Sequence, residues 1–399
     1  MVGQDYFRGR LGDIYELSPI PYLSGTGTLF REGTGHDAEW ELNADITGNH
    51  VLVLTLHDYL NFDSLAQPGG AFVECTFRGT TTDGEWAVHS SAVIVPGMSI
   101  VETGQVLYCQ FRQMRLEKHG AAKCPTEIQA QIMNFSFSPG RFRIQVQGRE
   151  VVFALSPSES TIRRLLESKR IDRAVLSTVS IPINGDLSEA RHVLGHIGQM
   201  LSISNLNANF SPIYLELAEG CVVATEILGC VTSPYHRNVV IDNLYVRNGL
   251  CSFIEATYDT YVRLDNSWDL RKLVSNLLGM YEGKFLENKI AGLILSLEYL
   301  LTKYLQAQGV LGLADLNIQQ KIRQTNSTLR FIPAALQGDD LRSGVRNPLF
   351  HQGEIVIADH NDLIRTYAEY SNLLFRILFR ILGYGGQFIS RVNYEPTSV

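Results

Sequence analysis

The spacing of the apolar residues changes character near Asp265, and this change restricts the chain to folds that join a β-rich part to a helical part. Before this point, short segments rich in β-branched and aromatic residues alternate with glycine-containing turns, a pattern typical of strands. After it, apolar residues recur every three or four positions, as in amphipathic helices. A chain of 399 residues also exceeds one ordinary core. We therefore predict an α+β multidomain protein.

The first 262 residues are predicted to form one β-rich, sandwich-like module, with a division into two subdomains near residue 155 left open. Short antiparallel strands at this spacing favour a sandwich or a strongly curved sheet. Two helical insertions are expected, at residues 161–169 and 187–201. The clearest strands are expected at residues 51–56, 71–77, 106–111, 142–147, 174–183, 213–217, 222–228 and 253–257.

Residues 265–385 are predicted to form an all-α bundle, followed by a loose tail at residues 386–399. The apolar stripe of residues 287–306 is the clearest helix signal, because its leucines and isoleucines repeat at helical spacing. Gly383 follows the last helix, where glycine commonly ends helices. The expected helices cover residues 269–281, 287–306, 315–325, 334–345 and 361–382.

Composition and charge favour a cytoplasmic protein without a membrane segment. Hydrophobic residues make up 45% and charged residues 19% of the chain, and no apolar run is long enough to span a bilayer. No signal-peptide pattern opens the chain, and none of the six cysteines forms a C-x-x-C pair. The net charge of −7 is uneven: residues 265–399 hold 14 basic and 13 acidic residues, leaving 20 and 28 for the rest. The helical part is therefore expected to bind nucleic acid only at a local site.

The segment Arg346-Asn347-Pro348-Leu349-Phe350-His351 places an arginine, an amide and a histidine within six residues. A guanidinium can clamp a phosphodiester through two hydrogen bonds. Histidine can give or take a proton near neutral pH. RNA cleavage needs both functions, so Arg346, Asn347 and His351 are the predicted catalytic residues. Pro348 lacks a backbone donor, so we expect the helix to break or kink beside it.

This bundle with its R-N-x-x-x-H motif resembles the HEPN superfamily. The segment Ile294-Leu-Ser-Leu-Glu-Tyr-Leu-Leu301 resembles the S/A-L-E-x-L-L helix of that family. The β-rich leader resembles, in layout, the N-terminal module of ApeA-type abortive-infection proteins. The resemblance implies a metal-independent endoribonuclease, without cofactor, that acts on RNA as a homodimer in anti-phage defence. It also implies a β-rich module that senses a phage-derived trigger or restrains the enzyme, and products with 2′,3′-cyclic phosphate ends.

Several alternatives stay open at the level of sequence. Glu298, within the apolar stripe, is either an auxiliary site residue that orients Arg346 or His351, or a residue at the bundle edge. Arg346 has Glu354 as another possible ion-pair partner. The chain also repeats the R-x4-H pattern at Arg191 and His196, where His192 and His196 would suit zinc.

A non-catalytic function is the main competing hypothesis. In it the bundle only dimerises or docks, and the β-rich module recognises a protein, a glycan or a nucleotide.

Overall fold

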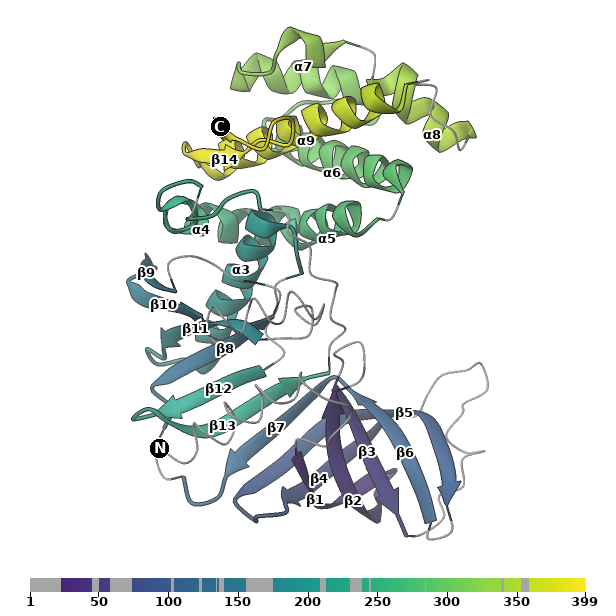
Figure 1. Ribbon diagram of the computed structural model, residues 1–399, viewed down its shortest axis with the longest axis vertical. Helices are drawn as coiled ribbons and strands as arrows, with labels where there is room; N and C mark the ends of the chain where they lie inside the picture. Colours follow the sequence, from purple (N-terminus) through teal and green to yellow (C-terminus); the bar gives the residue numbers. More distant parts are fainter. Residues whose placement is uncertain are drawn as a thin grey trace.

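A computed structural model describes most of the chain and confirms the α+β class (Figure 1). The described residues are 23–44, 50–57, 74–101, 104–121, 124–133, 135, 140–155, 175–208, 213–229, 239–243, 245–283, 285–338, 341–352 and 359–399. The expected helix at residues 161–169 lies outside them. No helix in these ranges is long and apolar enough to cross a bilayer.

Thirteen strands of the described chain form one antiparallel sheet, in the order β4-β1-β2-β3-β6-β5-β7-β13-β12-β8-β11-β10-β9. The expected strands before residue 230 appear within about two residues of their predicted bounds, except that the strand expected at residues 71–77 is β4 and ends at Thr81. The strands are β1 Leu23–Arg31, β2 Thr34–Ala44, β3 His50–Leu56, β4 Glu74–Thr81, β5 Trp86–Val101, β6 Gly104–Phe111, β7 Gln113–Lys118, β8 Glu127–Met133, β9 Arg141–Val146, β10 Arg149–Leu155, β11 Val175–Pro182, β12 Ile213–Ala218 and β13 Cys221–Leu228.

Of the two predicted arrangements, the structure shows the strongly curved sheet and not the sandwich, because the first six strands close into a barrel. Strand β4 pairs with both β1 and β5, which completes the ring β1-β2-β3-β6-β5-β4. The long strand β5 makes this possible: its register against β6 shifts between Ile94 and Gly97, while its first residues pair with β7. Inside the barrel, Trp40 and Phe77 are fully buried and contact edge to face. A Cβ at Gly25 would collide with the Thr80 carbonyl, so this glycine allows β1 and β4 to approach.

The sheet leaves the barrel through β7 and opens into a flat end that the helices cover (Figure 1). Helix α3 (Leu187–Asn205) packs on β8 and β11, as the sequence predicts for residues 187–201, and α4 (Gly249–Trp268) packs on β9. The backbone N–H of Gln145 on the sheet edge donates to Glu255 of α4 at 2.9 Å. This bond covers an edge strand that would otherwise expose unpaired backbone groups.

The C-terminal helices stack on α3 and α4, and the apolar stripe of α6 lies in their centre. Residues 253–257, expected to be a strand, belong to α4, which also spans the expected boundary between residues 262 and 265. Part of the expected tail is ordered as a hairpin that buries Phe388. The elements are α5 Leu270–Glu282, α6 Leu286–Ala307, α7 Ile318–Leu329, η3 Ala334–Gln337, η4 Leu341–Arg346, α8 Asn347–Gln352, α9 His360–Leu382, β14 Gln387–Ile389 and β15 Pro396–Ser398.

Two hydrophobic cores hold the described residues together. One fills the barrel and extends under β12 and β13. The other is continuous from the open end of the sheet through α3 and α4 to α9, and runs from Ile128 to Phe388. Among the described residues, the open end of the sheet thus shares a core with the helices, whereas the barrel has a core of its own.

Candidate active site around Arg346

Arg346 lies where the helix type changes. Residues 341–346 form a π-helical turn (η4), and α8 begins at Asn347, so that Pro348 is its second residue. A proline suits the first turn of a helix because the backbone N–H it lacks would have no partner there. Where the sequence predicts a break or kink beside Pro348, the structure shows a change from π- to α-helix at Asn347 without an interruption of the helical run. The single helix expected at residues 334–345 is wrong: a 3-10 turn at Ala334–Gln337 precedes the π-helical turn.

The guanidinium of Arg346 is bound by Glu298 of α6. Its Nε donates to Oε1 of Glu298 at 2.8 Å, and Nη1 makes a longer contact of 3.4 Å to Oδ1 of Asn347. The side chains of Arg346 and Glu298 are 32% and 24% exposed, so the pair lies at the surface without being fully solvated. The guanidinium also stacks over the ring of Phe350 at 5.8 Å from its centroid.

These contacts fix the arginine but do not use all its donors. A guanidinium carries five N–H donors, and the described contacts take one on Nε and one on Nη1. Nη2 has no hydrogen-bond partner in the part of the chain that the structure describes. The carboxylate thus holds one edge of the guanidinium, and within the described residues the Nη2 group remains for another acceptor.

His351 belongs to α8 by its backbone, one helical turn after Asn347. Its side chain lies outside the described part of the structure, as does all of Glu354, the other partner considered for Arg346. The structure therefore brings together Arg346, Asn347 and Glu298. Of His351 it shows only that the backbone lies in α8, the helix that begins at Asn347.

The second R-x4-H match, at Arg191 and His196 on α3, lies beside buried carboxylates. Arg191 donates to Oε1 of Glu216 at 2.7 Å and pairs with Glu226. His196 is buried, whereas His192, four residues earlier on α3, is exposed. The Nε2 atom of His196 lies 3.4 Å from Oδ2 of Asp265. Burial lowers the pKa of His196, and Asp265 only partly opposes this effect.

No metal site accompanies these histidines in the described residues. In those ranges, no three His, Cys, Asp or Glu side chains lie close enough together to hold an ion. His192 and His196 thus lack a third ligand there.

Sequence reasoning missed a buried charge network that joins β7, β12, β13 and α3. Glu216 is 2% exposed and accepts two hydrogen bonds from Arg115, at 2.7 and 3.1 Å, besides the one from Arg191. Burial alone would raise the pKa of Glu216, but the hydrogen bonds and charges of Arg115 and Arg191 outweigh it and lower the pKa. The missed signal was a glutamate inside each of the apolar strands at residues 213–218 and 221–228.

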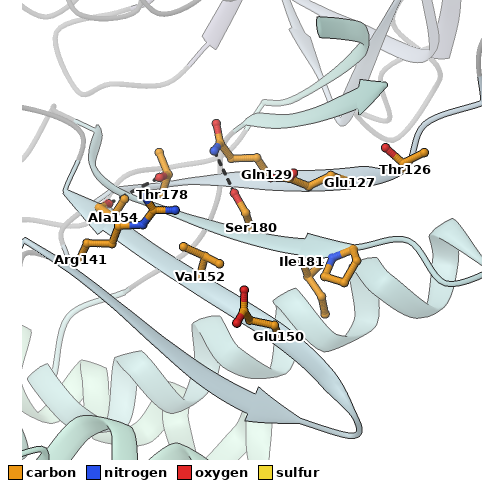
Figure 2. Close-up of a pocket in the computed structure, with 11 residues that line it drawn as sticks. Thr126, Glu127, Gln129, Arg141, Glu150, Val152, Ala154, Thr178, Ser180 and Ile181 are labelled. Atoms are coloured by element: carbon orange, nitrogen blue, oxygen red, sulfur yellow. Dashed lines mark hydrogen bonds between the residues drawn. The ribbon is translucent and has the colours of Figure 1, made fainter. Parts of the chain in front are cut away.

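A polar trough crosses the open end of the sheet, on the face opposite α3 (Figure 2). It has a volume of about 520 Å³. It forms because neighbouring positions of β10 and β11, such as Ala154 and Thr178, carry short side chains. Arg141 and Glu127 lie at opposite ends of the trough (Figure 2), and neither has an ion-pair partner among the described residues. The lining side chains are those of Thr126, Glu127, Gln129, Arg141, Glu150, Val152, Ala154, Thr178, Ser180, Ile181 and Pro182.

Comparisons of the chain with protein-family models, with curated proteins and with solved structures find no match.

Proposed function

We propose that the protein is a metal-independent endoribonuclease of the HEPN type, with its site at Arg346, Asn347 and His351. One observation carries the proposal: Arg346 is held by Glu298 through Nε, and its Nη2 group has no acceptor among the described residues. An arginine positioned in this way can bind the non-bridging oxygens of a phosphodiester as negative charge develops there. Glu298 is then a positioning residue that orients Arg346.

The chemistry needs no metal because RNA supplies its own nucleophile, the 2′-OH. His351 acts as general base or acid, a contribution of roughly 10²–10⁴ in rate. Asn347 contacts the ribose or orients the histidine. Attack of the 2′-oxygen on phosphorus breaks the P–O5′ bond, and the leaving 5′-oxygen takes a proton. The products are a 2′,3′-cyclic phosphate and a 5′-OH.

The active form is proposed to be a homodimer, which supplies one histidine for each proton transfer. Two large apolar side chains beside the arginine support a contact there. Leu295 lies one helical turn before Glu298 on α6 and is 47% exposed, and Phe350 beneath Arg346 is 45% exposed. Apolar surface next to a polar site is typical of an interface.

We further propose a role in anti-phage defence, in the cytoplasm, with the β-rich part sensing a trigger or restraining the enzyme. The continuous core between the open sheet and the helices supports such control, because binding to the sheet would reach the helices through packed side chains. Full-rate cleavage by the resting full-length protein would contradict the restraint.

The test is cleavage of a labelled RNA pool in EDTA by the wild type, Arg346→Ala and His351→Ala. Both variants should lose activity, and RNA methylated at its 2′-oxygens should resist. His360→Ala is the matched control, because His360 is an exposed histidine at the start of α9. Arg191 and His196 are unsuitable controls, since their removal would disturb buried contacts. Cleavage that survives Arg346→Ala and His351→Ala would refute the site.

The trough supports a second candidate function, recognition of a ligand by a non-catalytic module. Its size is that of small-molecule sites, and an arginine at one end with hydroxyls and amides between suits an elongated ligand with an anionic group, such as a nucleotide. A nucleotide panel should then raise the melting temperature of the wild type but not of Arg141→Ala. Arg247→Ala, an exposed arginine outside the trough, is the control. No shift with any nucleotide would refute this candidate.

A further inference from the structure

The segment from Tyr299 to Arg330, which includes α7, is basic in a chain whose net charge is negative. Between Tyr299 and Arg330 the sequence contains four basic residues and one acidic residue, Asp315, whereas the whole chain carries a net charge of −7. Helix α7 has no acidic residue at all and is rich in Gln, Asn, Ser and Thr. Such a composition offers cations and neutral hydrogen-bonding groups, and few charges that would repel a polyanion.

Lys321 of α7 is held beside the site. Its Nζ donates to Oγ1 of Thr302 on α6 at 3.1 Å. Thr302 follows Glu298 by one helical turn, and side chains at such positions lie next to one another on a helix. Since Glu298 binds Arg346, the two cations Arg346 and Lys321 are attached to neighbouring positions of one helix face.

The spacing of these cations suits a nucleic acid strand. One helical turn rises about 5.4 Å, and a stacked strand carries one phosphate per about 3.4 Å of its axis. Glu298 and Thr302, the α6 residues that hold the two cations, are one such turn apart, a spacing that suits phosphates one or two nucleotides apart. Lys321 has no carboxylate partner among the residues that the structure describes, so its charge is available.

Helix α7 is also held rigidly, as a binding surface requires. A capping box between Asn317 and Gln320 fixes its start. At its end, Oδ1 of Asn326 accepts a hydrogen bond from the backbone N–H of Ile332 at 2.8 Å. In Figure 1, α7 forms the outer edge of the helical end of the molecule, away from the barrel.

We infer that the α6–α7 surface around Lys321 binds the single-stranded RNA substrate at a phosphate next to the one that Arg346 contacts. This inference rests on the proposed ribonuclease function for the identity of the ligand. Lys321 binds and positions the strand and takes no part in the proton transfers. Binding through it is electrostatic and independent of base sequence.

The test measures binding of a fluorescent single-stranded RNA of about 20 nucleotides, a length of the order of known single-strand sites, to the full-length chain in EDTA. All proteins carry His351→Ala, so that cleavage does not interfere. Lys321→Gln, which keeps a donor for Thr302, should weaken binding about two- to fivefold. It should also reduce the magnitude of the slope of log K, the binding constant, against log salt concentration by about 0.7, the value for one phosphate contact on a single strand. Lys321→Arg should bind as the parent does.

Lys289→Gln is the matched control, because Lys289 lies on α6 nine residues before Glu298, on the opposite face at 3.6 residues per turn. Equal effects of Lys321→Gln and Lys289→Gln would overturn the inference, as would absence of RNA binding or equally tight binding of polyglutamate. The cleavage assay separates the two claims. Lysine-dependent RNA binding together with cleavage that survives Arg346→Ala and His351→Ala would refute the proposed active site alone. Cleavage with no effect of Lys321→Gln on binding would refute this surface alone.

Discussion

Glu298 and Arg346 are 48 residues apart in the sequence and joined by a hydrogen-bonded ion pair of 2.8 Å. The pair connects the central helix of the bundle to the turn that carries the proposed catalytic motif. It also explains why a carboxylate occurs within the apolar stripe of α6: its partner is a cation that a neighbouring element brings to the same surface.

A double-mutant cycle should detect this pair as a coupling in stability. We expect a coupling energy of about 1 kcal/mol between Glu298→Gln and Arg346→Gln, the upper range for partly exposed pairs. Urea denaturation of the wild type, both single variants and the double variant measures it. The more exposed pair of Arg365 and Glu369, at 3.9 Å, should show almost none. Equal coupling in the two pairs would contradict a specific role for Glu298.

Replacing Pro348 by alanine should affect activity more than stability. Alanine restores a backbone donor and allows a regular α-helix to run through the turn at Arg346. We expect RNA cleavage to fall about tenfold, since small misplacements of a catalytic group are costly, while the free energy of unfolding changes by about 1 kcal/mol or less. Cleavage kinetics and urea denaturation together test this. Unchanged cleavage would show that the π-helical turn is not needed to place Arg346.

The exposed apolar residues beside the motif should control dimerisation. Leu295→Glu places a charge in the proposed interface, so light scattering should show a monomer where the wild type is a dimer, and cleavage should be lost with it. Leu311→Glu is the control, because Leu311 is 91% exposed and lies outside α6 and α8. A dimer that survives Leu295→Glu would place the interface elsewhere.

Removing Arg191 should destabilise the protein strongly. Glu216 and Glu226 are 2% and 6% exposed, and Arg191→Ala would leave the second carboxylate without its cation. Breaking a buried pair in this way costs about 3–5 kcal/mol. Urea denaturation measures the loss, with the exposed Arg263 on α4 mutated to alanine as the control. A loss no larger than that of the control would mean that the network is not important for folding.

His196 should make stability depend on pH in the mildly acidic range. Burial lowers its pKa in the folded protein below the ordinary value of 6.5, so the unfolded chain binds the proton first. Its contribution to stability is therefore complete above pH 6.5 and decreases as the pH falls from 6.5 through the lower folded pKa. The contribution of this one group to the slope of the free energy of unfolding against pH cannot exceed about 1.4 kcal/mol per pH unit. His196→Gln should remove this part of the pH profile, and an identical profile in the variant would contradict the assignment.

Local patterns in the sequence predicted most of the individual elements. The stripe of α6 and the helix at Leu187–Asn205 were readable because one helix face repeats apolar residues. Helix α4 was misread at residues 253–257, where apolar and β-branched residues imitate a strand. The spacing of Phe253, Tyr258 and Tyr261, which are buried, was in fact helical.

Long-range pairing was not readable from the sequence. The barrel closes because β4 pairs with β5 and also with β1, more than 40 residues away in the chain, and no local pattern specifies that contact. The same limit applies to the site. The motif and the unusual Glu298 were each visible in the sequence, but the hydrogen bond between Glu298 and Arg346 appears only after the helices are packed.

The ratio of RNA cleavage rates of the wild type and Arg346→Ala, measured in EDTA on one labelled RNA pool, tests the central claim most directly. Loss of an arginine that stabilises charge at the phosphate should lower the rate about 10²–10³-fold, with 2′,3′-cyclic phosphate ends on the wild-type products. Equal rates for the two proteins would contradict the proposed active site.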